Sequence, residues 1–382
     1  MVINMENKDF IVERDGKQFV DVVKLLPHSI PSGKIILWRG IDEERVEISV
    51  DKSSARGGNA KAVVIKRFVE INEDLFELFG LRMGDGIRKQ AEENTLGFSN
   101  TNLDLIKEFL RVVKIAFGID SFQFKCGVQL TSQLAKNVDS IEKNISTVLK
   151  IPLDNFWNPR INEKRNTAGI DIRNDSRLWG IILNGLLDNV IMKFVFENKS
   201  FSAKVLQGII ASEANIFVRK EGRLSDIMIA AEGEDKRNFI RQLLLLLDVQ
   251  PNKDKTIPGN EGTCINGLSN FRKMKEWNLV DLQPNKLTDF ERGLQGFKKE
   301  EFRKGEGKLL ILQSLRESSK RAFELSKELD RTQKAINWTM NKLEKKGLVE
   351  NFRISRNIFW KLTEDGSKLI NNGVTLEKLK NN

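Results

Sequence analysis

With 382 residues, 40% of them hydrophobic, the chain is long enough for two or three domains with buried cores, which excludes a wholly disordered protein. A single histidine (His28), two well-separated cysteines and no tyrosine exclude a clustered zinc site and a histidine-based or tyrosine-based active site. An enzyme of this composition would have to work with carboxylates, lysine, arginine and a hard metal ion. The sequence contains no apolar run of about 18 residues and no signal pattern, so we expect no membrane span and a cytoplasmic location.

The net charge of +10 is concentrated near the C-terminus. Residues 303–382 contain 18 Lys or Arg against 10 Asp or Glu. A basic terminal module is typical of proteins that bind a polyanion, most often nucleic acid. Charge alone does not separate this interpretation from a merely soluble surface.

Residues 1–70 alternate short apolar runs with turns, which predicts a small strand-rich N-terminal region whose function the sequence does not reveal. The next segment, from Asn72 onward, predicts a helix with Asn72 as its N-cap. Gly80 and Gly84 lie four residues apart on one face of this helix. Because glycine inside a helix costs about 1 kcal/mol relative to alanine, the pair indicates a close contact with another helix.

A similar helix recurs downstream, where Gly208 and Ser212 repeat the spacing of small residues. An acid follows each pair, Asp85 in the first copy and Glu213 in the second. A predicted hairpin, an amphipathic helix and a strand–helix unit come next in both copies, which indicates an internal duplication. We therefore predict an α+β fold with four parts: an N-terminal region (1–70), a first repeat (71–195) with an insertion at about 121–165, a second repeat (196–302) and a C-terminal module (303–382).

The two duplicated helices would pack at a pseudo-twofold axis and bring Asp85 and Glu213 together. Two adjacent carboxylates repel each other unless a cation lies between them, and Mg²⁺ is the natural choice. A metal ion that activates water and neutralises a phosphoryl group would support phosphodiester hydrolysis.

The segments LFGLRMGDG (78–86) and LQGIIASEA (206–214) resemble the two signature helices of the LAGLIDADG homing endonuclease family. The similarity covers roughly residues 70–300. It implies duplicated αββαβ repeats around a two-helix interface, with saddle-shaped sheets lying on the DNA major groove. It carries the family's metal-binding catalytic position onto Asp85 and Glu213. The DNA-facing hairpins would present the basic residues Arg88, Lys89, Arg219, Lys220 and Arg223.

The chain departs from this family pattern in ways that leave cleavage open. Ala214 replaces the closing glycine of the second motif, and Met83 and Ala211 occupy a position that is usually acidic. For the active-site basic residue, Arg173 is a candidate by position and Lys125 by residue type. The alternative is a purely structural role, in which Asp85 and Glu213 are ordinary helix-terminal acids in a duplicated scaffold.

The C-terminal module predicts three helices followed by two strands, and it resembles the winged helix-turn-helix family over residues 307–366. We expect a core stripe that includes Leu312, Phe323 and Met340, and we interpret Trp338 as a packing residue. The third helix would enter the major groove by its N-terminal part, and the wing would reach phosphate or the minor groove. The candidate DNA-binding residues are Arg331, Thr332, Gln333, Lys334 and Asn337 on this helix, and Arg353 and Arg356 on the wing. Some winged helices bind proteins instead.

Three functions follow as hypotheses. The first is a Mg²⁺-dependent, site-specific endonuclease that cuts double-stranded DNA with Asp85 and Glu213. The alternative is a domesticated, non-cleaving transcriptional regulator on the same fold, by analogy with a bacterial regulator family that combines a LAGLIDADG-like domain with a helix-turn-helix. The third is an RNA-splicing maturase. A monomer is expected, since the pseudo-twofold axis lies within one chain.

Overall fold

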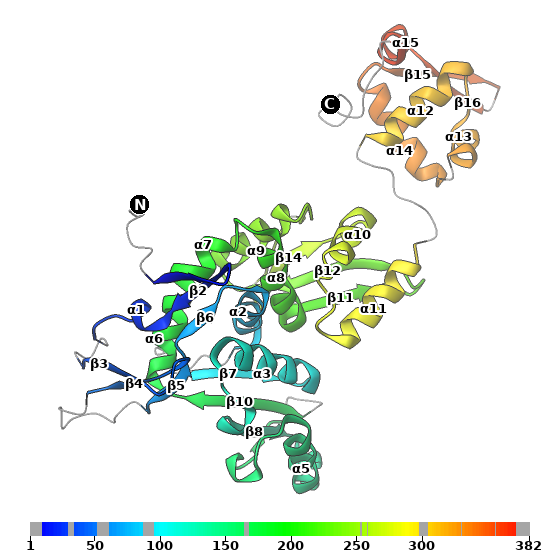
Figure 1. Ribbon diagram of the computed structural model, residues 1–382. Helices are drawn as coiled ribbons and strands as arrows, with labels where there is room; N and C mark the ends of the chain where they lie inside the picture. Colours follow the sequence, from blue (N-terminus) through cyan, green and yellow to red (C-terminus); the bar gives the residue numbers. More distant parts are fainter. Residues whose placement is uncertain are drawn as a thin grey trace. The chain divides into compact units, whose positions relative to one another are not determined.

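A computed structural model describes residues 10–29, 34–51, 61–86, 95–163, 168–252, 254–257, 259–297, 305–329, 331–355 and 357–371. The chain divides into two compact units, residues 1–296 and 297–382 (Figure 1). None of the helices in these described ranges has the length and apolar composition of a membrane-spanning segment.

Two helices, α2 (Glu73–Asp85) and α8 (Lys199–Glu213), pack along each other at the centre of the first unit (Figure 1). The side chain of Asn72 caps α2 by accepting a hydrogen bond from the Leu75 N–H at 3.1 Å. A Cβ atom placed on Gly80 would lie 2.3 Å from the carbonyl oxygen of Val205. The close helix contact that the small-residue spacing predicts is therefore present, and only glycine fits at this position.

The first repeat continues into a four-stranded sheet whose order is β7-β10-β8-β9. Its strands are β7 (Thr95–Asn100), β8 (Lys125–Leu130), β9 (Arg160–Ile161) and β10 (Gly169–Asp175). An amphipathic helix, α3 (Leu103–Phe117), packs on this sheet, where Phe98 stacks on Phe109 with ring centroids 4.9 Å apart. The sequence of this repeat ends in α6 (Arg177–Leu186), the π-helical turn η3 (Leu187–Ile191) and α7 (Met192–Phe194).

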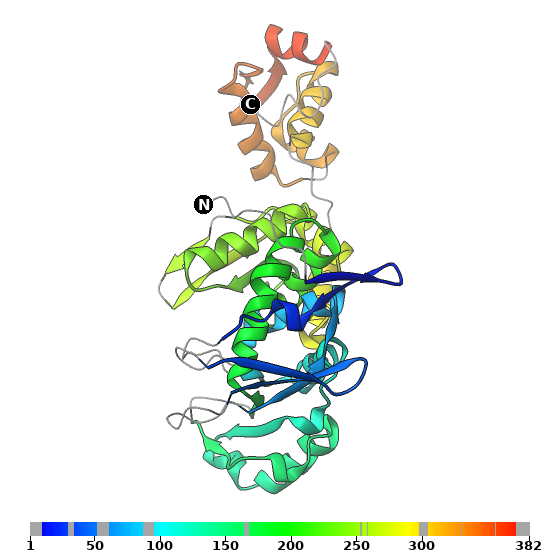
Figure 2. The same ribbon diagram turned by 60° about the vertical axis from the view of Figure 1, so that its left-hand side comes forward.

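The second repeat builds a sheet with the order β11-β12-β14-β13. Its elements are β11 (Ala214–Val218), β12 (Leu224–Ala230), α9 (Glu234–Leu246), β13 (Lys255–Ile257), β14 (Asn260–Ile265), α10 (Leu268–Glu276) and α11 (Pro284–Gln295). β12, β14 and β13 occupy the places that β7, β10 and β8 occupy in the first sheet. The two sheets lie on opposite sides of the central helix pair (Figures 1 and 2). This arrangement confirms the predicted α+β fold of two repeats around a central two-helix interface.

The first repeat carries two further helices, α4 (Ser132–Ala135) and α5 (Val138–Leu149), together with β9. The N-terminal region forms two three-stranded sheets, shown in blue in Figure 2. One contains β1 (Ile11–Arg14), β2 (Lys17–Asp21) and β6 (Phe68–Glu70), and the other contains β3 (Ile36–Gly40), β4 (Arg45–Val50) and β5 (Val63–Lys66). A short helix, α1 (Val22–Leu25), follows β2.

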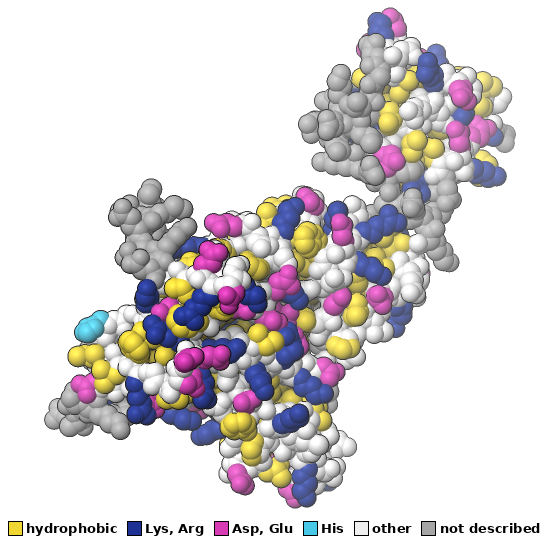
Figure 3. Space-filling view, viewed as in Figure 1, with side chains coloured by type: hydrophobic (Ala, Val, Ile, Leu, Met, Phe, Trp, Pro, Cys, Tyr) yellow, Lys and Arg dark blue, Asp and Glu magenta, His cyan; other side chains and the backbone are white. Residues whose placement is uncertain are grey.

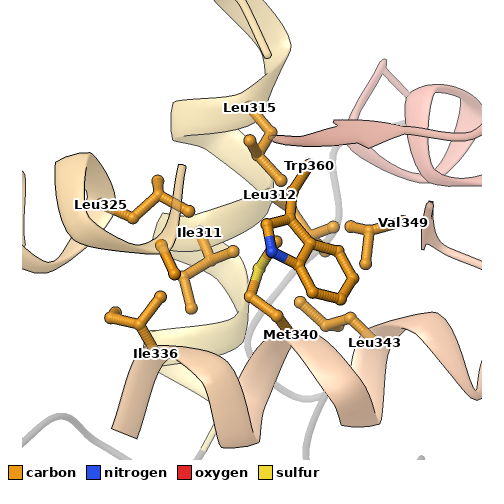
Figure 4. Close-up of a cluster of buried hydrophobic side chains, with 10 residues drawn as sticks. Ile311, Leu312, Leu315, Leu325, Ile336, Met340, Leu343, Val349 and Trp360 are labelled. Carbon is orange, nitrogen blue, oxygen red and sulfur yellow. The ribbon is translucent and has the colours of Figure 1, made fainter. Parts of the chain in front are cut away.

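The second unit is the predicted winged helix. Its elements are α12 (Glu306–Glu317), α13 (Ala322–Glu328), α14 (Gln333–Glu344), β15 (Val349–Ile354), β16 (Asn357–Leu362) and α15 (Glu364–Asn371). Leu312, Met340 and Leu343 lie around the buried ring of Trp360 in its core (Figure 4). Two expectations were wrong: Phe323 is 47% exposed and Trp338 is 62% exposed. Trp360 from the wing takes the core volume that these rings leave.

Paired acids and a candidate nucleic-acid interface

The two predicted acids end the two central helices. Asp85 is the last residue of α2 and Glu213 is the last residue of α8, so both lie at the same end of the helix pair. Burial raises the pKa of Asp85, and the nearby negative charge of Glu213 adds to this effect. The duplication therefore brings the two carboxylates together, as the motif spacing indicates.

Each acid is held by a donor from the strand–helix junction of its own repeat. Asn100, the last residue of β7, donates its Nδ2–H to Oδ2 of Asp85 at 2.6 Å. Lys236, in the first turn of α9, donates from Nζ to Oε1 of Glu213 at 2.9 Å. The two donors differ in charge, but each lies where a strand of its repeat is followed by the amphipathic helix. The sequence interpretation missed both, although the duplication itself marks the junctions where they lie.

A third group, the side chain of Lys286 in the first turn of α11, reaches the same place. Its Nζ donates to the carbonyl oxygens of residues 210–212, at 3.0, 2.6 and 3.4 Å, and so caps the last turn of α8. Burial lowers the pKa of Lys286 to about 8, whereas the charges of Asp85 and Glu213 oppose this shift. Lys286 is thus a partly buried cation within electrostatic reach of both acids.

These residues do not fit a magnesium ion. Mg²⁺ needs an octahedral shell of free oxygen ligands, several of which stay water. Each carboxylate accepts one hydrogen bond through one of its oxygens, Asp85 from Asn100 and Glu213 from Lys236, and Lys236 brings a positive charge with it. The ammonium group of Lys286 adds a positive charge in the field of both acids, and this charge would repel a divalent cation.

The two basic residues that sequence reasoning put forward lie elsewhere. Arg173 sits on β10, with its guanidinium carbon 3.9 Å from the ring centroid of Trp157. Asn100, which holds Asp85, pairs in register with Ile170, so Arg173 begins about 10 Å further along the strand. Lys125 pairs with Arg173 in register on β8. Among the described residues, the cations that reach the acids are Lys236 and Lys286.

The described hairpin residues lie in one basic turn of an otherwise charge-balanced unit. Arg88 and Lys89 lie outside the described residues. Arg219 and Lys220 are exposed in the β11–β12 turn, where Arg219 donates its backbone N–H to the Arg223 carbonyl at 2.8 Å, and Arg223 is half-buried. The first unit holds 43 Lys or Arg against 41 Asp or Glu. On the face shown in Figure 3, the two signs are interspersed over this unit.

The winged helix gathers most of its predicted contact residues on one helix. Thr332 caps α14 by accepting from the Ala335 N–H at 3.2 Å, and the side chains that follow it, Gln333, Lys334 and Asn337, are exposed. Arg331 is half-buried, and its backbone N–H donates to the Ser326 carbonyl at 2.8 Å. On the wing, Arg353 is exposed in β15, whereas Arg356 lies outside the described residues. This unit holds 20 Lys or Arg against 12 Asp or Glu.

No model of a known protein family matches the chain, and no curated protein matches it. Among solved structures it is similar to full-length DUF199/WhiA from Thermatoga maritima, with 11% identity and a TM-score of 0.37, over 72% of this chain and 90% of that one. A similarity of this size carries no argument about function. The prediction that the chain is a LAGLIDADG homing endonuclease was wrong, because no family model supports it and the similar structure is DUF199/WhiA.

Proposed function

We propose that this protein binds specific sites in double-stranded DNA and acts as a regulator that does not cut them. The observation that carries the proposal is the exposed N-terminal half of α14, set in the unit that holds most of the positive charge excess. A winged helix of this kind inserts that part of its third helix into the major groove.

The residues on α14 suit contact with base edges. Gln333 and Asn337 are exposed and offer a donor and an acceptor each, while Lys334 adds a positive charge beside them. Arg353 on β15 is exposed and suits contact with a phosphate, which positions the protein without reading sequence. The basic excess of the unit supplies attraction to the DNA backbone.

The paired acids support binding without cleavage. Hydrolysis of a phosphodiester would require Asp85 and Glu213 to hold a metal ion that activates water. In this chain Lys236 and Lys286 already supply positive charge beside the two carboxylates. The hydrogen bonds from Asn100 and Lys236 tie the ends of the central helices to the strand–helix junctions of their repeats.

The test uses the full chain and duplexes that it enriches from a random-sequence library. We expect saturable binding that falls steeply with salt, no strand scission in the presence of Mg²⁺ or Mn²⁺, and a loss of affinity in Asn337→Ala. Lys368→Ala, an exposed substitution on α15 of the same unit, is the matched control and should bind normally. Metal-dependent cutting that Asp85→Asn abolishes would overturn the proposal, as would a stronger preference for RNA over the enriched duplex.

A further inference from the structure

A groove of about 520 Å³ opens on the winged helix between α13, α14 and β16. Gln333, Asn337 and Asn341 line its α14 wall. These three residues are spaced four apart, so their amides form one stripe along the helix. Asn357, the first residue of β16, also lines the groove. The wall is therefore dominated by carboxamide groups, which carry no charge and combine a donor with an acceptor.

The described lining of this groove contains little positive charge. Among the described residues that line it, Arg321 is the one cation, and its Nε and Nη2 donate to Oε1 of Glu324 at 3.0 and 2.7 Å. Lys334 and Lys342 of α14 do not line the groove. Lys342 places its Nζ 3.6 Å from the ring centroid of Trp338, which does not line the groove. A ligand in the groove thus meets mainly amides, together with one guanidinium group that is paired with a carboxylate.

The groove also contains exposed apolar side chains. Phe323 from α13 is 47% exposed and Ile358 from β16 is 42% exposed, and both line it. Exposed groups of this size normally mark contact surfaces when they gather beside polar residues. A partner that fits must therefore offer hydrogen-bond donors and acceptors for the amides, with apolar groups close beside them.

We infer that this groove reads A·T base pairs. This inference rests on the proposed function and narrows its target to sites with adenine and thymine where α14 enters the major groove. Asparagine and glutamine can bond adenine through N6 and N7 together, whereas guanine offers two acceptors and is matched by arginine or lysine. Phe323 and Ile358 supply the apolar contact that the thymine methyl group requires. Asn337 lies in the middle of the amide stripe and is the main specificity-determining residue.

The experiment selects duplexes from a random library with the full chain and compares wild type, Asn337→Ala and Lys368→Ala. We expect wild type to enrich A·T pairs at its central positions. Asn337→Ala should lower affinity for that site about tenfold or more and relax the preference there. Lys368→Ala, the exposed control on α15, should keep the preference, since it lies off the amide stripe.

Modified bases separate the two contacts. Replacing the central adenines with 7-deazaadenine should weaken wild-type binding and leave Asn337→Ala little affected. Replacing thymine with uracil should weaken binding by the wild type, and Phe323→Ala should bind the two duplexes equally well. Melting curves of each variant check that it is folded. Enrichment of G·C pairs at these positions, or an unchanged preference in Asn337→Ala, would overturn the inference and leave DNA binding standing. A chain that enriches no duplex at all would overturn the proposed function as well.

Discussion

In the first unit, 43 Lys or Arg residues nearly balance 41 Asp or Glu residues, whereas the second unit holds 20 against 12. Some charges of the first unit meet in partly buried positions, as Lys286 does beside Asp85 and Glu213. The polar side chains that follow the cap of α14, such as Gln333 and Asn337, are instead left exposed. The difference fits our proposal that the second unit, and not the first, presents its polar side chains to a partner.

Removing the internal cation should have the largest effect. Lys286→Met leaves Glu213 with Lys236 alone as a cationic partner among the described residues, removes the positive charge near Asp85, and leaves the last carbonyl groups of α8 uncapped. We expect a loss of about 3 kcal/mol in the free energy of unfolding, measured by urea denaturation. Lys275→Met removes an exposed pair with Glu291 and should cost less than about 1 kcal/mol. Equal stabilities of the two variants would show that Lys286 neutralises nothing.

The contact between α2 and α8 should be nearly as sensitive. Gly80→Ala would place a Cβ 2.3 Å from the Val205 carbonyl oxygen, so the helices must separate. We expect a loss of roughly 2–3 kcal/mol from overpacking, seen as a lower melting temperature. Gly185→Ala in α6 is the matched helical control, because its Cβ would meet only flexible atoms of the Leu25 side chain at 3.3 Å. If Gly80→Ala melts no lower than Gly185→Ala, the helices are further apart than described.

Stability should also depend on pH through Glu77, which is buried in α2 and lies 3.0 Å from Lys204 of α8. Burial raises the pKa of Glu77 to about 7, above its unfolded value. Its contribution to stability is therefore complete below the unfolded pKa, near 4.5, and is lost as the pH rises through about 7. Chemical denaturation between pH 5 and pH 8 should show this loss of order 1–2 kcal/mol, and Glu77→Gln should flatten it. A wild-type profile as flat as that of the variant would contradict the assignment.

The smallest effect should come from a single wing contact. Arg353→Ala removes one phosphate contact, so it should weaken binding to all duplexes alike and reduce the salt slope of the binding constant by about 1. Arg39→Ala, an exposed change in the first unit, should leave the slope unaltered. A change of sequence preference in Arg353→Ala would place the wing among the base readers.

Much of the fold could be predicted from short-range patterns. The Asn72 cap, the glycine-containing helix faces and the repeated order of elements all depend on neighbours a few residues apart, which sequence periodicity records. The cations beside the acids could not be predicted from such patterns. Lys286 reaches α8 from a helix far along the chain, and nothing in its local sequence distinguishes it from an exposed lysine. The exposure of Phe323 and Trp338 escaped prediction for a similar reason, since Trp360 from the wing fills the core.

Our central proposal is that the winged helix binds DNA and that the paired acids do not hydrolyse it. In the most direct measurement, the full chain is incubated with its enriched duplex and Mg²⁺, or with EDTA as the control. Binding and strand integrity are followed in the same samples. We predict an intact duplex throughout, and an affinity that Mg²⁺ lowers only as far as its screening of the phosphates requires. Strand scission that requires Mg²⁺ and disappears in both Asp85→Asn and Glu213→Gln would contradict the account.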